Sequence, residues 1–107
     1  MIDISIEKKG AAFRRLTFDG HAGFADYGSD IVCASVSVLV INAVNSVEAF
    51  TDDRLQVESD AERGYIDIRL PGVHSGESDL LFKSAMLGLK AIGDQYPDYV
   101  RIEMKEE

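Results

Sequence analysis

Alternation of apolar and polar residues predicts five β-strands in this chain. In the first, isoleucines at every second position alternate with polar residues, which is the pattern of a strand with one buried face. The second is less regular because Arg14 and Arg15 are adjacent. Turn residues rich in glycine, proline and acidic side chains separate the segments. The predicted strands cover residues 2–7, 13–18, 54–58, 65–70 and 100–105.

Two further stretches have the spacing of three and four residues that is typical of helices. The first covers residues 31–50 and follows Asp30, whose carboxylate is a suitable N-cap. It has two apolar faces, one formed by Val32, Val36, Val40, Ala43, Val47 and Phe50, the other by Ile31, Val38, Ile41 and Val44. The second begins in the acidic stretch 75–79 and ends before Pro97, with an apolar face of Phe82, Ala85, Met86, Leu89 and Ile92.

The predicted order of elements is ββαββαβ. This order favours an α+β two-layer sandwich in which two helices pack on one mainly antiparallel sheet. A length of 107 residues suits a single domain over residues 1–107. One sheet covers only one face of the helix at 31–50, so we expect the other face to be covered by the second helix and by a second copy of the chain. The pattern therefore predicts a homodimer.

The candidate chemistry lies in a glycine-rich stretch and the start of the helix that follows it. Cys33, the only cysteine, falls in the first helical turn, where the helix dipole favours a thiolate. His21 lies on the preceding loop and is available as a proton acceptor. A small buried hydrophobic residue is the other interpretation of a single cysteine. Gly20, Gly23 and Gly28 favour the functional one, because such loops bend sharply or approach a ligand.

The ordered set of Gly20-His21-Ala22, Tyr27-Gly28, Asp30-Ile31-Val32-Cys33-Ala34, Ser37 and Val44-Asn45 resembles the signature of the bacterial ribosomal-processing cysteine protease (Prp) family. The resemblance implies a cysteine endopeptidase that removes the N-terminal extension of a large-subunit ribosomal protein, the twenty-seventh. It also implies that His21 and Cys33 are the catalytic residues, acting through an acyl-enzyme, and it agrees with a homodimer.

Other residues of this stretch have subsidiary roles in the hypothesis. Asp30 is either the helix cap or a group that orients His21, and we assign it to capping. Main-chain amides at the helix start, including that of Cys33, are candidate donors to the oxyanion. Ser37 shares the face of Cys33 and is an auxiliary candidate, although its hydroxyl can instead bind the backbone one turn earlier. The loop residues assigned to the substrate are Gly20, Ala22, Gly23, Tyr27 and Gly28.

The net charge of the chain limits the classes of partner that we expect it to bind. Eleven basic and nineteen acidic residues give a formal charge of −8, which disfavours direct binding to nucleic acid. An acidic protein suits a basic partner, such as the N-terminal segment of a ribosomal protein, but solubility alone explains the same charge. The apolar stretch at 31–44 is interrupted by serines and is shorter than a membrane span. With no signal peptide expected and no disulfide to form, we predict a cytoplasmic protein without membrane contact.

Two other functions remain open from the sequence. A non-catalytic dimeric module could bind a ribosomal protein or an assembly intermediate, and a thiol sensor is disfavoured because no second cysteine is present to resolve it. We expect no metal and no cofactor. His74 lacks neighbouring zinc ligands and is predicted to be a solvated loop residue. The acidic pairs Asp52-Asp53 and Glu106-Glu107 are predicted to be solvated ends of elements.

Overall fold

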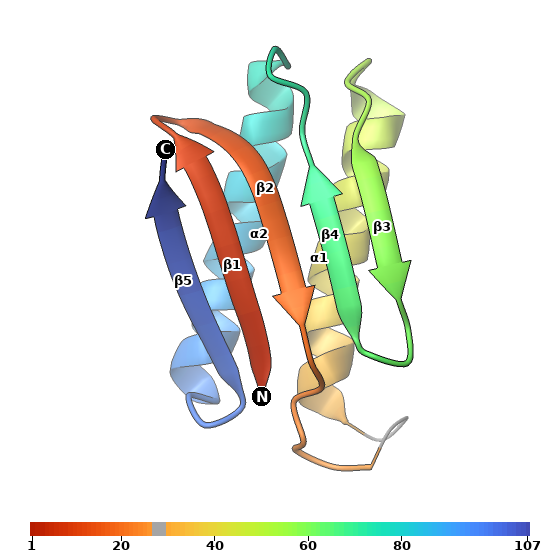
Figure 1. Ribbon diagram of the computed structural model, residues 1–107, viewed down its shortest axis with the longest axis vertical. Helices are drawn as coiled ribbons and strands as arrows, with labels where there is room; N and C mark the ends of the chain where they lie inside the picture. The colour runs from red at the N-terminus through yellow and green to blue at the C-terminus, as the bar shows by residue number, and fades with distance from the viewer. Residues whose placement is uncertain (27–29) are drawn as a thin grey trace.

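The computed structural model describes residues 1–26 and 30–107, and its elements follow the predicted order ββαββαβ (Figure 1). The α+β prediction is confirmed. The strands are β1 (Ile2–Lys9), β2 (Ala12–Asp19), β3 (Gln56–Asp60), β4 (Tyr65–Arg69) and β5 (Val100–Glu106), and the helices are α1 (Ile31–Phe50) and α2 (Gly76–Gln95).

One five-stranded sheet has the strand order β3-β4-β2-β1-β5. The hairpin pairs β1–β2 and β3–β4 and the pair β2–β4 are antiparallel, whereas β5 lies parallel to β1, so the sheet is mixed. Both helices cover the same face of the sheet, which gives two layers (Figure 1). The irregular pattern of the second strand has a structural cause: between Glu7 and Lys8 the register with β2 shifts by one residue, which accommodates Arg14 as an extra residue.

The hydrophobic core lies between the sheet and the helices. It is formed by the predicted alternate residues of the strands and by one face of each helix. On the opposite face of the sheet, Asp67 is buried and forms ion pairs with Arg15 and Arg69. The main core residues are Ile2, Ile4, Ile6, Phe13, Leu16, Phe18, Val32, Val36, Val40, Ala43, Val47, Ile68, Phe82, Ala85 and Leu89.

The two apolar faces of α1 differ in burial. The face of Val32 and Val47 packs into the core, except that Phe50 at its end is 75% exposed. On the second face only Val44 packs against the core, while Val38 remains 66% exposed in the single chain. The same helix is 20 residues long with a mean hydropathy of 1.7, which is long and apolar enough to cross a membrane. The argument that this stretch is too short for a span is therefore wrong, although in this fold the helix packs on the sheet.

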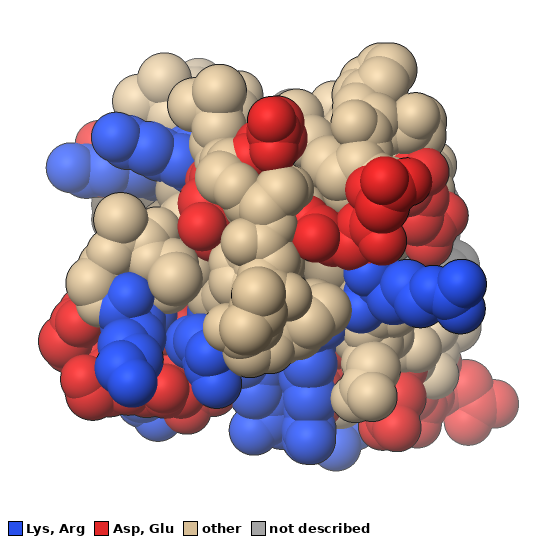
Figure 2. Space-filling model, turned by 90° about the horizontal axis from the view of Figure 1, so that it is seen from above, with Lys and Arg blue, Asp and Glu red and all other residues tan. Residues whose placement is uncertain are grey.

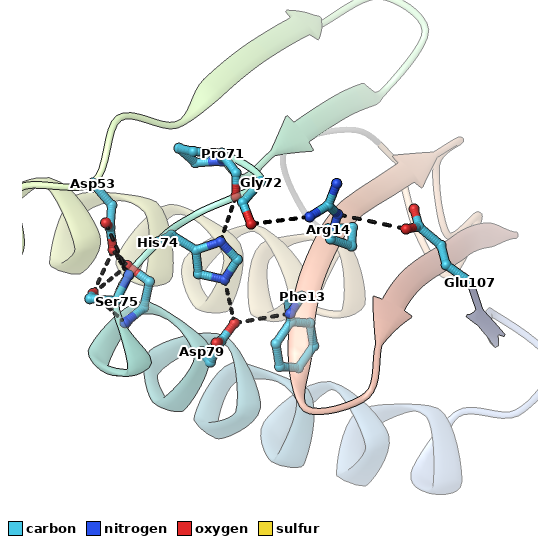
Figure 3. Close-up of polar contacts among 10 residues, drawn as sticks. Phe13, Arg14, Asp53, Pro71, Gly72, His74, Ser75, Asp79 and Glu107 are labelled. Carbon is cyan, nitrogen blue, oxygen red and sulfur yellow. Dashed lines mark hydrogen bonds and ion pairs between the residues drawn. The ribbon is translucent and has the colours of Figure 1, made fainter.

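The structure also corrects the prediction for His74 (Figure 3). Its side chain is only 2% exposed. Nδ1 lies 2.6 Å from the Pro71 carbonyl oxygen and Nε2 lies 2.7 Å from Oδ1 of Asp79. The chain turns between β4 and α2 and thereby places the ring under the start of the helix. The residue is therefore part of the packing and is not a solvated loop residue.

Some residues of the acidic pairs that were predicted to be solvated ends form hydrogen bonds within the protein. Asp53 accepts hydrogen bonds from the backbone and hydroxyl of Ser75 and from the hydroxyl of Ser78, so it adds an external cap to α2. Glu106 accepts a hydrogen bond of 2.6 Å from the backbone of Gly10. Asp52, Glu106 and Glu107 are exposed, as predicted, and only Asp53 is half-buried.

Candidate active site

Three segments that are distant in the sequence meet at one end of the sheet, drawn lowermost in Figure 1. They are the start of α1, the loop that follows β2, and the turn between β3 and β4 at residues 61–64. Cys33 contributes a partly buried thiol from the first turn of α1. The backbone N–H of Ala22 donates to its Sγ over 3.1 Å, which joins the loop to the helix.

Asp30 is the N-cap of α1. Its Oδ1 accepts hydrogen bonds from the backbone N–H groups of Val32 and Cys33, both at 3.0 Å. Its Oδ2 accepts from Phe24 N–H at 3.1 Å, so the same carboxylate also fixes the loop. Burial opposes the charge, but the hydrogen bonds from the Cys33 and Phe24 amides hold the pKa of this carboxyl below its usual value. Both oxygens bind main-chain amides, so the geometry is that of a cap.

The surroundings of Cys33 favour its neutral thiol over the thiolate. Burial raises the pKa of Cys33, the N–H of Ala22 lowers it, and the charge of Asp30 raises it further, with a net rise. The prediction that the helix start favours a thiolate is therefore wrong for the free protein. The main physical reason is the burial of the thiol, and Asp30 adds a negative charge at the end of the helix where the dipole is positive. Ionisation of this thiol requires a base.

His21 lies on the loop beside the β3–β4 turn. Its Nε2 is 3.1 Å from the carbonyl oxygen of Glu62, which can only accept, so Nε2 carries the proton. In the neutral ring Nδ1 then holds the lone pair that a base requires. The backbone around His21 is fixed by a 3.0 Å hydrogen bond from Gly20 N–H to Gly64 O, and Met1 N lies 2.6 Å from the carbonyl oxygen of His21.

Two adjoining cavities have His21, Cys33 and Ser37 in their walls. Their volumes are about 290 and 680 Å³. Ser37 lines both cavities. A hydrogen bond from a helix hydroxyl to the backbone one turn earlier is formed at Ser35, which donates to Ile31 O. Of the predicted loop residues, Gly20 lines the smaller cavity, Gly23 lines the larger one, and Ala22 is buried beneath them; Tyr27 and Gly28 lie outside the described residues.

The sequence did not identify the β3–β4 turn as part of the site. Ala61 lines both cavities, and Glu62 lines the larger one. Gly64 has a φ of +69°, and a Cβ at this position would lie 2.7 Å from Gly20 O and 3.0 Å from Cε1 of His21. The sequence predicts a turn at these residues. Nothing local to it indicates that the turn contacts a loop about forty residues earlier in the chain, so its part in the site was missed.

Comparison with known proteins identifies the family. A family model described as "Cysteine protease Prp" matches residues 1–101. The chain belongs to the Prp family of cysteine proteases. The Prp protein of Staphylococcus aureus, named a ribosomal processing cysteine protease, is 29% identical over 104 residues, which cover 97% of each chain. The Prp protein of Bacillus subtilis, with the same name, is 31% identical over 87 residues, or 78% of each chain.

Solved Prp structures have the same fold. A crystal structure of S. aureus Prp in complex with a covalently linked product peptide matches with a TM-score of 0.93 and 28% identity, over 98% of this chain and all of that one. A second structure of S. aureus Prp, with a substrate peptide, matches with a TM-score of 0.87, 27% identity and the same coverage. The whole of the fold described above is therefore that of a Prp cysteine protease.

Proposed function

We propose that this protein is an endopeptidase that removes the N-terminal extension of a large-subunit ribosomal protein, the twenty-seventh, with Cys33 as nucleophile and His21 as general base. One observation carries the assignment. A cysteine protease needs a thiol at a substrate-accessible site, and the only cysteine of the chain lines the same cavities as a histidine.

Because the raised pKa of Cys33 favours the neutral thiol, proton transfer accompanies attack. His21 takes the proton from Sγ of Cys33 while the sulfur forms a bond to the scissile carbonyl carbon. The protonated imidazole then gives this proton to the leaving amine as the C–N bond breaks, which leaves a thioester on Cys33. Water, deprotonated by His21, attacks the thioester, and the departing thiolate recovers a proton from the imidazolium.

The oxyanion donor differs from the one expected at the helix start. The amide of Cys33 is bound to the Asp30 carboxylate and is not available in this arrangement. The amide of Ala22 is better placed, since it donates toward Sγ over 3.1 Å. When the substrate carbon is bonded to Sγ, its oxygen lies beside the sulfur, within reach of this N–H.

The substrate assignment rests on the relatives and on charge. The S. aureus relative is named a ribosomal processing protease and has been crystallised with substrate and product peptides. Among the described residues that line the two cavities, Asp30, Asp60 and Glu62 are acidic, and none is Lys or Arg. This lining suits a basic peptide segment. A ribosomal protein as substrate implies a cytoplasmic enzyme in ribosome biogenesis, without direct contact with nucleic acid or membrane.

Cleavage of a synthetic peptide that spans the N-terminal extension tests the proposal. By mass spectrometry we expect cleavage at one position by the wild-type protein, none by Cys33→Ala or His21→Ala, and very little by Cys33→Ser. Ser35→Ala is a matched control, because Ser35 is an exposed helix residue outside both cavities. Full activity of Cys33→Ala would contradict the proposal, and binding of the peptide by the wild type without cleavage would instead support a non-catalytic binding module.

A further inference from the structure

We propose that the substrate peptide binds as an additional β-strand along the open edge of β3 and enters the cavity of Cys33 from there. This inference rests on the proposed function and adds the binding mode of the substrate. It commits to one occupant, an extended basic peptide segment.

The first argument is the edge itself. β3 is the last strand in the sheet order and pairs only with β4 among the described strands. Each of its five residues is exposed. An edge strand presents a row of unpaired N–H and C=O groups, and an extended peptide can satisfy them by strand addition.

The second argument is that this edge carries no basic residue and no proline, and its charged residues, Glu58 and Asp60, are acidic and would not repel a basic peptide. β3 has the sequence Gln-Val-Glu-Ser-Asp, without lysine, arginine or proline. The opposite edge strand, β5, carries Arg101 and Lys105. Charged residues, lysine above all, are a common means of blocking edge-to-edge pairing. Val57 is 44% exposed although it lies opposite the fully buried Ile68, so an added strand would cover apolar surface on the helix side.

The third argument is continuity with the site. Ser59 and Asp60, at the end of β3, line the smaller cavity together with Cys33. Ser37 and Val40 of α1 form the facing part of the lining. Neighbouring strands lie about 4.8 Å apart, so a peptide paired with β3 would lie beside the Ser59 and Asp60 that line this cavity. The strand edge thus aligns the peptide backbone with the proposed nucleophile.

The fourth argument is charge. Glu58 of β3 and Glu62 of the following turn are exposed carboxylates. The arginine of this turn does not neutralise them, because Arg63 forms a 2.8 Å ion pair with Asp19 and its guanidinium lies over the ring of Tyr65. The edge and the turn therefore attract basic side chains of a peptide, in agreement with the acidic lining of the cavities.

A backbone N-methyl scan of the substrate peptide tests strand addition. Binding is measured with the Cys33→Ala protein, so the result does not depend on cleavage. Because alternate residues of a strand direct their N–H groups to the same side, methylation at every second position should weaken binding about fivefold or more, while the intervening positions change it less than twofold. A scan without this alternation would overturn the inference even if the wild-type protein cleaves the peptide.

Proline variants test the same edge from the side of the protein. The N–H groups of adjacent residues in β3 point in opposite directions, so one of Val57 and Glu58 directs its N–H to the open edge. Proline is tolerated at such a position. Of Val57→Pro and Glu58→Pro, the variant with the higher melting temperature should bind the peptide at least about fivefold more weakly than wild type. Unchanged affinity in a folded variant contradicts the inference, and the peptide scan remains decisive if neither variant folds.

Charge reversal on the two edges provides a matched comparison. Glu58 on β3 and Glu103 on β5 are both exposed residues of edge strands. Glu58→Lys and Glu103→Lys change the net charge equally, so a general electrostatic effect would weaken binding of a basic peptide by the same factor in both. The inference predicts a larger loss for Glu58→Lys, which diminishes at high salt. Equal losses would overturn it.

Discussion

Backbone atoms of the β3–β4 turn hold the imidazole of His21 in place. Its Nε2 binds a carbonyl oxygen of the turn, and Gly64 lies against the ring and against the loop backbone. The reactivity of the proposed base therefore depends on the exact conformation of a turn that is distant in sequence. Gly64 and Gly10 both have a positive φ, but only Gly64 lies against His21.

Gly64→Ala should reduce kcat/KM strongly, whereas Gly10→Ala should leave it unchanged. The new Cβ would lie 2.7 Å from Gly20 O and 3.0 Å from His21 Cε1 and would displace the ring. A displacement of about 1 Å in a catalytic group costs up to about 100-fold in rate. Gly10→Ala is the control, since Gly10 has a φ of +59° and no atom within 4 Å of an added Cβ. Gly10→Ala should lose roughly 1 kcal/mol of stability through backbone strain. Gly64→Ala should lose more, because its Cβ also meets the backbone of Gly20, and only this variant should lose activity. Equal kcat/KM in the two variants would show that the ring is not displaced.

The pKa of Cys33 should fall in Asp30→Asn. The negative charge of Asp30 raises the pKa of this thiol, and asparagine removes the charge but remains a good N-cap. The rate of alkylation by iodoacetamide, measured between pH 6 and pH 10, reports the thiolate fraction. We expect the alkylation profile of the variant to shift to lower pH, with a loss of roughly 1–3 kcal/mol of stability because the amide nitrogen cannot accept the hydrogen bond from Phe24 N–H. An unshifted profile would contradict the role assigned to the Asp30 charge.

At the scale of elements, His74 connects the start of α2 to the sheet. Its ring lies between two acceptors, the carbonyl oxygen of Pro71 and the carboxylate of Asp79. The same Asp79 oxygen accepts a 2.9 Å hydrogen bond from the backbone of Phe13 in β2 (Figure 3). Only an imidazolium donates from both nitrogens, so this arrangement favours the charged form.

Stability should therefore decrease as the pH rises through the titration of His74. Burial lowers the pKa of His74, but the Pro71 carbonyl and the Asp79 and Asp53 carboxylates raise it more, so the net shift is upward. A raised pKa in the folded state stabilises fully below the unfolded value of about 6.5, and this contribution is lost as the pH rises through the folded value. Urea unfolding at several pH values between 5.5 and 8.5 should show the decrease in wild type and a smaller one in His74→Gln. Parallel curves for the two proteins would contradict the assignment.

The elements were predictable from the sequence to a greater extent than their contacts. Alternation in β1 and the helical period of α1 predicted both element types and most of the buried face of each, although Phe50 at the end of that face of α1 is exposed. The parallel pairing of β5 with β1 depends on how α2 crosses the sheet, which no local pattern encodes. For the same reason the sequence located Cys33 and His21 but not Gly64, and it missed the burial of His74.

The thiol of Cys33 illustrates the same limit within the site. Its place in the first helical turn was predictable, and so was the capping role of Asp30. Its protonation state depends on the balance between burial, the Ala22 amide and the Asp30 charge, and this balance follows from distances in three dimensions.

At the scale of the whole molecule, the net charge of −8 is unevenly distributed. Seen from the end opposite the site, acidic and basic groups are interspersed with neutral ones, and neither sign dominates (Figure 2). The lining of the two cavities has acidic residues but no lysine or arginine among the described residues. Local complementarity to a basic peptide therefore arises at the site, and the total charge contributes a weaker long-range attraction.

The exposed side of α1 is an apolar surface that a partner could cover. Residues 31–47 contain no charged side chain. Ile31, Val38 and Ile41 on this side are 55%, 66% and 53% exposed, and they recur at helical spacing. α2 packs beside the helix but leaves these three uncovered. An uncharged apolar strip of this kind is typical of an interface, and the same helix carries Cys33 at its start.

We therefore predict that the protein is a two-fold homodimer through this side of α1, in which each strip meets its copy. Light scattering should give about twice the chain mass of 11.8 kDa for the wild type at low micromolar concentration. Ile41→Asp places two carboxylates near the symmetry axis and should give folded monomers, because a buried unpaired charge is costly at an interface. Leu87→Asp is the control, since Leu87 is 75% exposed on α2 and should leave the dimer intact. If dimerisation also stabilises the start of α1, Ile41→Asp should lower kcat/KM in proportion to the fraction of monomer. A wild-type mass of 11.8 kDa at every concentration would contradict the dimer, and α1 would then expose its apolar strip to solvent.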